Sequence, residues 1–292
     1  MPIDRTATAA MACLLACTAP VEPDCLLPSD TSPLPTELRE ASGATFTADG
    51  TLWVIADSGP AVLYAVSSAD SIIARVQITG ARNDDWEALA SGPCGDGAEC
   101  LFIGEIGDNL HDAAERAILR VRAPTPRQTR AAAERLAFRF PDGPRDAEAL
   151  VRLPDGTILV ISKGRNGPIG VYRFPATPQP GIVTLEHVQD LSAGIAQVPD
   201  QVTGAAASLD GSIIVVRTYT TLQRYALDRD TLRAAGPPVR LDAQGETQGE
   251  GIALDQAGLV VLVGEGERQG TIARLRCHLG PLSAGGTKGA LF

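Results

Sequence analysis

The segment Trp53-Val54-Ile55-Ala56-Asp57 is a short apolar run that ends in a charged residue, and the chain repeats this pattern. Four more runs of the same kind follow, namely Leu101-Phe102-Ile103-Gly104-Glu105, Leu159-Val160-Ile161-Ser162-Lys163, Ile213-Ile214-Val215-Val216-Arg217 and Val261-Leu262-Val263-Gly264-Glu265. Turn pairs such as Asp49-Gly50 and Asp155-Gly156 stand before some of these runs, which is typical of β-hairpins. A recurrence at about fifty residues indicates a propeller or a solenoid.

Each run is the second strand of a larger unit. First strands are expected to begin near Ser42, Glu87, Glu148, Thr203 and Glu250, and fourth strands are expected near 72–79, 135–140, 183–190 and 237–242. The fifth unit has no fourth strand of its own, so the N-terminal segment around Cys25 is expected to complete it. The sequence therefore predicts an all-β fold, a single β-propeller of five four-stranded blades closed by N- and C-terminal strands. Six blades is the alternative if residues 124–134 hide strands instead of forming a helical turn.

The first residues predict export. A short, mostly small and apolar stretch ends in Leu14-Leu15-Ala16-Cys17, which resembles the bacterial lipobox, whose cysteine is acylated. We expect a lipoprotein signal peptide over 1–16, a lipid on Cys17, a Pro-rich tether over 17–35, the propeller over 36–280 and a flexible tail over 281–292. An ordinary cleaved signal is the alternative. The expected location is the periplasm or the outer surface, with membrane contact through the lipid only.

Cysteine usage agrees with export. Four cysteines remain once Cys13 is assigned to the signal and Cys17 to the lipid. Cys94 and Cys100 bracket the turn-rich residues 95–99, so a local disulfide is the natural choice, and it leaves Cys25 to pair with Cys277. A zinc site is disfavoured because no histidine stands nearby. The formal net charge of −10 and the lack of a basic stripe exclude nucleic acid as a partner.

First strands line the axis of a propeller, so equivalent residues on them form a ring. We expect Ser42, Thr203 and three glutamates, Glu87, Glu148 and Glu250, at one level. The residues that end the second strands are expected to line the channel nearby: Asp57, Glu105, Lys163, Arg217 and Glu265.

Three interpretations of this ring remain open. Lys163, Arg217 and Arg145 neutralise the glutamates in a structural network. Alternatively, Ca²⁺ is the cofactor, with oxygen ligands from Glu87, Glu148, Glu250, Asp108 and Asn109. In the third interpretation, the same groups bind a sugar or another polar ligand without a metal.

Several motifs around the ring resemble a family of uncharacterised secreted bacterial β-propeller proteins over roughly residues 40 to 277. They are Asp85-Trp86-Glu87-Ala88-Leu89, Ile103-Gly104-Glu105-Ile106-Gly107-Asp108-Asn109, Arg145-Asp146-Ala147-Glu148-Ala149-Leu150 and Gln248-Gly249-Glu250-Gly251-Ile252. Glu105 departs from that pattern, where Asp is expected. More distantly, the architecture is similar to the calcium-centred propeller lactonases and gluconolactonases, whose axial metal is held by Glu, Asn and Asp. This likeness implies calcium chemistry only at the level of the fold.

Catalytic side chains are scarce. The chain has three histidines and no Gly-x-Ser-x-Gly elbow, so the candidates for a general base are His111, close to the expected channel mouth, and a channel carboxylate. Two functions follow as expectations. One is a lipid-anchored propeller that binds a small molecule, a glycan or a protein through its channel mouth and loops. The other is a calcium-dependent hydrolase of small esters or lactones.

Overall fold

The computed structural model describes residues 25–26, 31–175, 181–229, 231–241 and 246–277. The predicted signal peptide, Cys17, most of the tether and the tail lie outside the described residues. Within the described part the fold is all-β. Its helical content is two short 3-10 segments, η1 (Thr36–Leu38) and η2 (Val198–Asp200). None of the helices in this part is long and apolar enough to cross a membrane.

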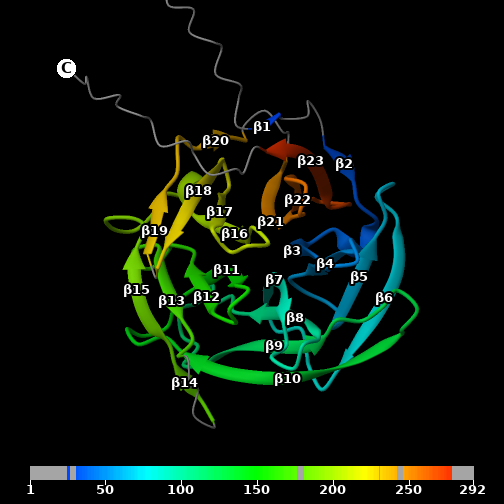
Figure 1. Cartoon of the computed structure of the whole chain (residues 1–292), viewed down its shortest axis with the longest axis horizontal. Helices are drawn as coiled ribbons and strands as arrows, with labels where there is room; N and C mark the ends of the chain where they lie inside the picture. The colour runs from blue at the N-terminus through cyan, green and yellow to red at the C-terminus, as the bar shows by residue number, and fades with distance from the viewer. Residues whose placement is uncertain (1–24, 27–30, 176–180, 230, 242–245, 278–292) are drawn as a thin grey trace, which may run out of the picture.

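Apart from the short strands β14 (Val183–Thr184) and β20 (Val239–Arg240), the described strands fall into five four-stranded antiparallel sets arranged around a common centre, which we number blades 1 to 5 in chain order (Figure 1). Blade 1 contains β3 (Ala41–Phe46), β4 (Leu52–Ala56), β5 (Val62–Val66) and β6 (Ile72–Thr79). Blade 2 contains β7 (Trp86–Pro93), β8 (Glu99–Glu105), β9 (Arg116–Arg122) and β10 (Arg130–Arg139). Blade 3 contains β11 (Ala147–Arg152), β12 (Ile158–Ser162), β13 (Gly170–Arg173) and β15 (Glu186–Asp190).

Blade 4 contains β16 (Val202–Ala207), β17 (Ile213–Thr218), β18 (Thr221–Asp228) and β19 (Thr231–Ala234). Blade 5 contains β21 (Gln248–Leu254), β22 (Leu259–Glu265) and β23 (Thr271–Cys277), and its outer strand is supplied by the N-terminal β1 (Cys25–Leu26) and β2 (Ser32–Pro33). The expectation that the two ends of the chain close the last blade is confirmed. Cys25 lies opposite Cys277 in this pairing, and the two form a disulfide. The local disulfide between Cys94 and Cys100 is also present.

Two details of the outer strands differ from the sequence expectation. Residues 124–134 were expected to include a helical turn, but β10 begins at Arg130, pairs with β9 and also runs parallel to the end of β6. Its alternating burial suits an outer strand of a blade, which turns one face to solvent. The outer strand of blade 4 was expected near 237–242. It is β19 instead, which follows β18 through a tight turn, and the short β20 (Val239–Arg240) pairs with the start of β18.

Burial explains the two strand patterns of the sequence. The second strands are buried on both faces, as in Trp53-Val54-Ile55, because each lies between neighbouring blades. Outer strands such as β6 alternate between buried and exposed residues because one face meets solvent. The apolar clusters accordingly join adjacent blades: Trp53 of blade 1 packs in one cluster with Leu101 of blade 2.

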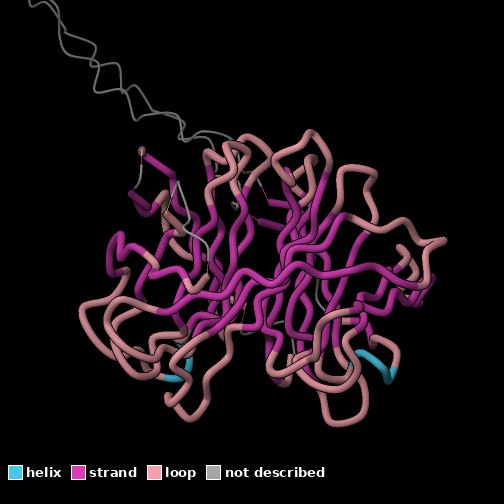
Figure 2. The backbone as a smooth tube through the Cα atoms, turned by 90° about the horizontal axis from the view of Figure 1, so that it is seen from below, coloured by secondary structure: helices cyan, strands magenta, loops and turns pink. Residues whose placement is uncertain are grey.

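The inner strands form a closed ring. Contacts run from β3 to β7, from β7 to β11, on to β16 and β21, and back to β3. Seen from the side the molecule is a thick disc, and η1 and η2, which precede β3 and β16, lie on the same face of it (Figure 2). We call this face, where the inner strands begin, the start face. The opposite face, where inner strands turn into second strands, is the turn face.

Removing the Cys25–Cys277 disulfide should destabilise the protein more than removing the Cys94–Cys100 disulfide. The first closes a loop with a sequence separation of 252 residues and the second one of 6 residues. The chain-entropy relation gives about 5 kcal/mol for the long loop and about 2 kcal/mol for the short one. Urea unfolding of the two double Cys→Ser variants measures both values. Equal losses would contradict a role for the long disulfide in closing the ring.

Candidate functional site

Every inner strand carries a β-bulge at the same place near its first residue. The register against the second strand shifts between Ala41 and Gly43, Trp86 and Ala88, Ala147 and Ala149, Val202 and Gly204, and Gly249 and Ile252. The residues within these bulges include Ser42, Glu87, Glu148, Thr203 and Glu250, which we call the ring residues. A bulge leaves its extra residue out of the ladder and redirects its side chain. The structure therefore gives the five positions that were aligned from sequence one common backbone geometry.

The residue after each ring residue is small for a steric reason. These residues are Gly43, Ala88, Ala149, Gly204 and Gly251. A Cβ atom on Gly43 would lie 2.8 Å from the backbone nitrogen of Leu89, and one on Gly204 would lie 2.9 Å from the Glu250 carbonyl oxygen. The inner strands thus approach each other backbone to backbone, which places the ring residues of neighbouring blades close together.

Ring residues are buried, with exposed fractions of 7% for Glu87, 2% for Glu148 and 3% for Glu250. Burial raises the pKa of Glu87 well above its ordinary range, and the charges of Glu148, Asp85 and Glu250 raise it further. Burial likewise raises the pKa of Glu148 and of Glu250. These carboxyl groups act on one another through space, so the structure brings the three predicted glutamates together although they are far apart in sequence.

Lys163 is the cation at the centre of this acidic group. Its Nζ lies 2.6 Å from Glu148 Oε1, and both side chains are buried. Burial alone would lower the pKa of Lys163, but the adjacent Glu148 carboxyl raises it above the ordinary lysine value. Lys163 also lies 5.9 Å from the centre of the Tyr219 ring. Burial and the charge of Glu250 raise the pKa of Tyr219 to about 12.

Tyr219 is a site residue that the sequence analysis did not identify. The strand register explains why. Ala147 and Val202 come directly before the ring residues of blades 3 and 4, and they pair with Ser162 and Thr218. The next residues along the second strands, Lys163 and Tyr219, therefore hold the same position in the two blades. Counting from the charged residue that ends each apolar run selected Arg217 instead. Aligning the second strands on the residue that follows their last pair with the inner strand would have found Tyr219.

A second group of carboxyl groups lies nearer the surface of the start face and is half-buried. Burial and the neighbouring Glu40 and Asp85 raise the pKa of Asp57 to about 6. Burial, Glu250 and Asp57 raise the pKa of Glu265 to about 7. Both predicted channel residues therefore belong to the site, and both change charge close to neutral pH.

The carboxyl groups of Asp85 and Glu87 both lie against Gly107, and burial raises the pKa of each. A Cβ on Gly107 would lie 2.4 Å from Asp85 Oδ2 and 2.7 Å from Glu87 Oε1, so only glycine fits beside this pair. The φ of Asp85 is +96°, a strained conformation for a residue with a side chain. Asp85 was quoted in a sequence motif, but it was not among the predicted site residues.

Two predicted channel residues have other partners. The Arg217 guanidinium is fully buried between β17 and blade 5, donates to the carbonyl oxygens of Gly251 and Val263 and pairs with Glu246. Glu105 lies 3.4 Å from Arg135 on the outer strand β10. In the register, Glu105 stands one residue and Arg217 two residues before the position that Asp57, Lys163 and Glu265 occupy in their blades. Arg145, expected to neutralise the glutamates, pairs with Asp142 instead.

The predicted metal ligands beyond the ring also have protein partners. Asp108 Oδ1 lies 3.0 Å from Arg116 and accepts a hydrogen bond from the Asp112 amide. Asn109 Oδ1 accepts from Arg165 at 2.5 Å and is exposed. His111 follows in the same loop, half-buried, and its Nδ1 has no hydrogen-bond partner.

These partners bear on the calcium interpretation. In the described residues no group of three His, Cys, Asp or Glu side chains is arranged to hold a metal ion. Glu148 is paired with Lys163, Asp108 with Arg116 and Asn109 with Arg165. This arrangement does not offer a calcium ion its usual six to eight oxygen ligands. Among the described residues, however, six buried oxygen atoms have no hydrogen-bond partner: Glu250 Oε2, Thr203 Oγ1, Asp146 Oδ2, Asp57 Oδ1, Glu246 Oε1 and Thr271 Oγ1.

Comparison with known proteins identifies the fold. The chain matches no protein-family model and no curated protein. Among solved structures, it is similar to the PQQ-bound aldose sugar dehydrogenase of Streptomyces coelicolor, with a TM-score of 0.52 and 12% identity over 87% of this chain and 100% of that one. A glucose dehydrogenase matches with a TM-score of 0.51 and 14% identity over 84% of this chain and 98% of that one.

The chain folds as a β-propeller. At such low identity the likeness shows the propeller fold alone, so it carries neither the sugar chemistry nor the cofactor of those enzymes to this chain. It also does not single out the secreted propeller family or the lactonases that the sequence resembles.

Stability of the propeller should fall as the pH rises from about 4.5 to about 7. Raised carboxyl pKa values, such as that of Glu265 at about 7, mean that the folded state holds protons that the unfolded state has released. This contribution to stability is complete below the pKa that the carboxyl group has in the unfolded chain. It is lost as the pH rises through the pKa that the group has in the folded protein. Glu265→Gln should therefore raise the melting temperature by roughly 1–3 °C at pH 8 and change it little at pH 5. Thermal unfolding at the two pH values measures this, and an equal shift at both would contradict it.

Proposed function

We propose that the protein is an exported propeller that binds a small polyhydroxylated ligand, such as a sugar unit of a glycan, at the start face. The observation that carries the proposal is the set of buried oxygen atoms without hydrogen-bond donors. Glu250 Oε2 and Thr203 Oγ1 belong to ring residues, Asp57 Oδ1 belongs to a neighbouring carboxyl group, and Asp146 Oδ2 has only the Arg165 guanidinium group, at 3.8 Å. A buried acceptor without a donor costs about 1–3 kcal/mol, which a ligand hydroxyl group can recover.

The chemistry of the site suits hydroxyl groups. A carboxyl group that holds a proton can donate one hydrogen bond and accept others, and the raised pKa values of Glu87, Glu148 and Glu250 favour this form. Lys163 and Tyr219 add donors. Such a mixture of donors and acceptors matches the hydroxyl groups of a polyol better than it matches an anion, which the carboxylates would repel.

Export fits the same proposal. Both disulfides are typical of an oxidising compartment. The lipid on Cys17 and the tether to the membrane are part of this proposal, on the strength of the lipobox-like sequence. Displayed in this way, the propeller presents its start face to ligands outside the cytoplasm.

A calcium-dependent hydrolase is the second candidate. Oxygen atoms without donors, Glu250 Oε2 and Thr203 Oγ1 among them, are also the ligands that a hard cation selects. Lys163 is evidence against this candidate, because its ammonium group is paired with Glu148 and repels a cation nearby. We therefore favour the polyol and derive no catalytic step.

Sugar binding tests the proposal directly. Calorimetric titration with a panel of monosaccharides and alditols should find at least one saturable ligand. Glu250→Gln should weaken it about tenfold, because an amide replaces an oxygen that accepts from the ligand. The matched control is Glu186→Gln, which removes the same charge from the exposed outer strand of blade 3. A panel without any ligand, or equal affinity of Glu250→Gln and the control, would overturn the proposal.

Metal addition separates the two candidates. The polyol proposal predicts that EDTA leaves the melting temperature unchanged and that millimolar CaCl₂ raises it by no more than NaCl of equal ionic strength. A stabilisation specific to calcium that Glu250→Gln abolishes would favour the hydrolase instead.

A further inference from the structure

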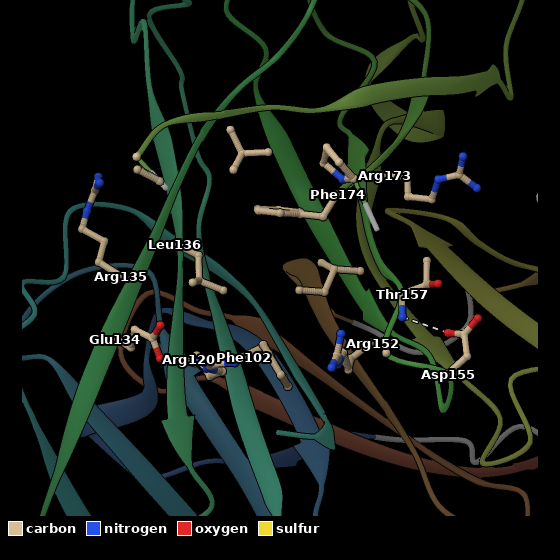
Figure 3. Close-up of a pocket in the computed structure, with 16 residues that line it drawn as sticks. Phe102, Arg120, Glu134, Arg135, Leu136, Arg152, Asp155, Thr157, Arg173 and Phe174 are labelled. Carbon is tan, nitrogen blue, oxygen red and sulfur yellow. Dashed lines mark hydrogen bonds and ion pairs between the residues drawn. The ribbon is translucent and has the colours of Figure 1, made fainter. Parts of the chain in front are cut away.

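A cavity of about 710 Å³ lies between blades 2 and 3, away from the axial site (Figure 3). Its walls come from β8, β9 and β10 on one side and from β12, β13 and the turn after β11 on the other. The volume falls in the range of about 300–1,000 Å³ that is typical of small-molecule sites. Neither the fold nor the proposed sugar site requires such an opening.

Arg152 is the residue that gives this cavity its chemistry. Its guanidinium group donates to the carbonyl oxygen of Pro93 and stacks on the Phe102 ring at 4.9 Å. Among the described residues no carboxylate lies within ion-pair distance of it. A half-buried guanidinium group without a carboxylate is uncommon, because desolvating a charge is costly unless it is paired.

Two glycines hold the Arg152 side chain in place. A Cβ on Gly92 would lie 2.5 Å from Arg152 Cγ, and a Cβ on Gly156 would lie 3.3 Å from its Nη2. Gly156 has a φ of +95°, which glycine adopts without strain. The conformation of Arg152 is therefore fixed by its surroundings before any ligand arrives, as in a preorganised binding site.

A second guanidinium group, that of Arg120, lies near Arg152. Figure 3 shows Arg120, Phe102 and Arg152 next to one another at one side of the cavity. Burial lowers the pKa of Arg152, and the like charge of Arg120 lowers it further. Only Arg120 has a carboxylate partner, Glu134. Two positive charges thus meet one directly paired negative charge.

The other two arginines of the cavity are engaged elsewhere. Arg135 pairs with Glu105 and Arg173 with Glu186. In Figure 3 their guanidinium groups point away from the centre of the cavity. Asp155 accepts a hydrogen bond from the Thr157 amide and acts on Arg152 only from a longer distance. The unbalanced positive charge is therefore local to Arg152.

The remaining wall is apolar, formed by Leu136, Ile158, Phe174 and Val183. We propose that this cavity binds a small organic monocarboxylate, with its carboxylate at Arg152 and its apolar body between Leu136 and Phe174. A single guanidinium group without a carboxylate partner matches one negative charge, and a guanidinium group binds a carboxylate through its N–H donors. Apolar walls favour a carboxylate with a hydrocarbon body over inorganic phosphate or sulfate.

Benzoate and benzyl alcohol are suitable probes, because they share a ring and differ in charge. Calorimetry on the full-length protein at low salt should show saturable benzoate binding at least tenfold tighter than binding of benzyl alcohol. Arg152→Gln should reduce benzoate affinity about tenfold. Arg135→Gln is the matched control, since it removes one positive charge from the rim of the same cavity, and it should change the affinity less than twofold.

A cavity-filling variant covers the case in which Arg152→Gln is unstable. Leu136→Trp keeps Arg152 and should abolish benzoate binding by occupying the apolar part. Equal binding of benzoate and benzyl alcohol, equal effects of the two arginine variants, or undiminished binding by Leu136→Trp would each overturn the proposal, as would the absence of saturable benzoate binding. These experiments do not involve the ring residues, so their outcome is independent of the sugar site.

Discussion

The burial of several carboxyl groups around a single lysine is the interaction on which the start face depends. Glu87, Glu148 and Glu250 lose their hydration together, and within the described part of the chain the one cation paired directly with them is Lys163. One lysine cannot balance three carboxylates, so the folded protein keeps protons on part of the group. The protonated groups act as hydrogen-bond donors, and the remaining oxygen atoms act as acceptors. This mixture gives the site its capacity to recognise a polar ligand.

The propeller makes this arrangement possible through repetition of a local irregularity. Each inner strand has a bulge at its start and a small residue next to it, so five backbones approach each other closely. Burial of such charge costs stability, and the fold offsets the cost through the apolar contacts between blades and through the disulfide that joins Cys25 to Cys277. Farther from the axis, blades 2 and 3 leave a separate cavity beside Arg152.

Much of the architecture was predictable, because it follows from a pattern that repeats. Apolar runs, turn pairs and the common place of Glu87, Glu148 and Glu250 predicted the strands and their meeting at the axis. The side chains around the ring were less predictable. On β17 the charged residue stands two positions before the one equivalent to Lys163, so counting from the charge selected Arg217 where the register places Tyr219. Ion pairs such as Asp108 with Arg116 join residues whose closeness depends on loop conformation, which no periodicity encodes.

Infrared difference spectroscopy across a pH titration measures the protonated carboxyl groups directly. The account predicts that the native protein keeps the absorption of a protonated, buried carboxyl group above pH 6, and that Glu87→Gln removes part of it. Ordinary exposed carboxyl groups lose this absorption by about pH 5. A native protein in which every carboxyl group has ionised by that pH would contradict the central claim.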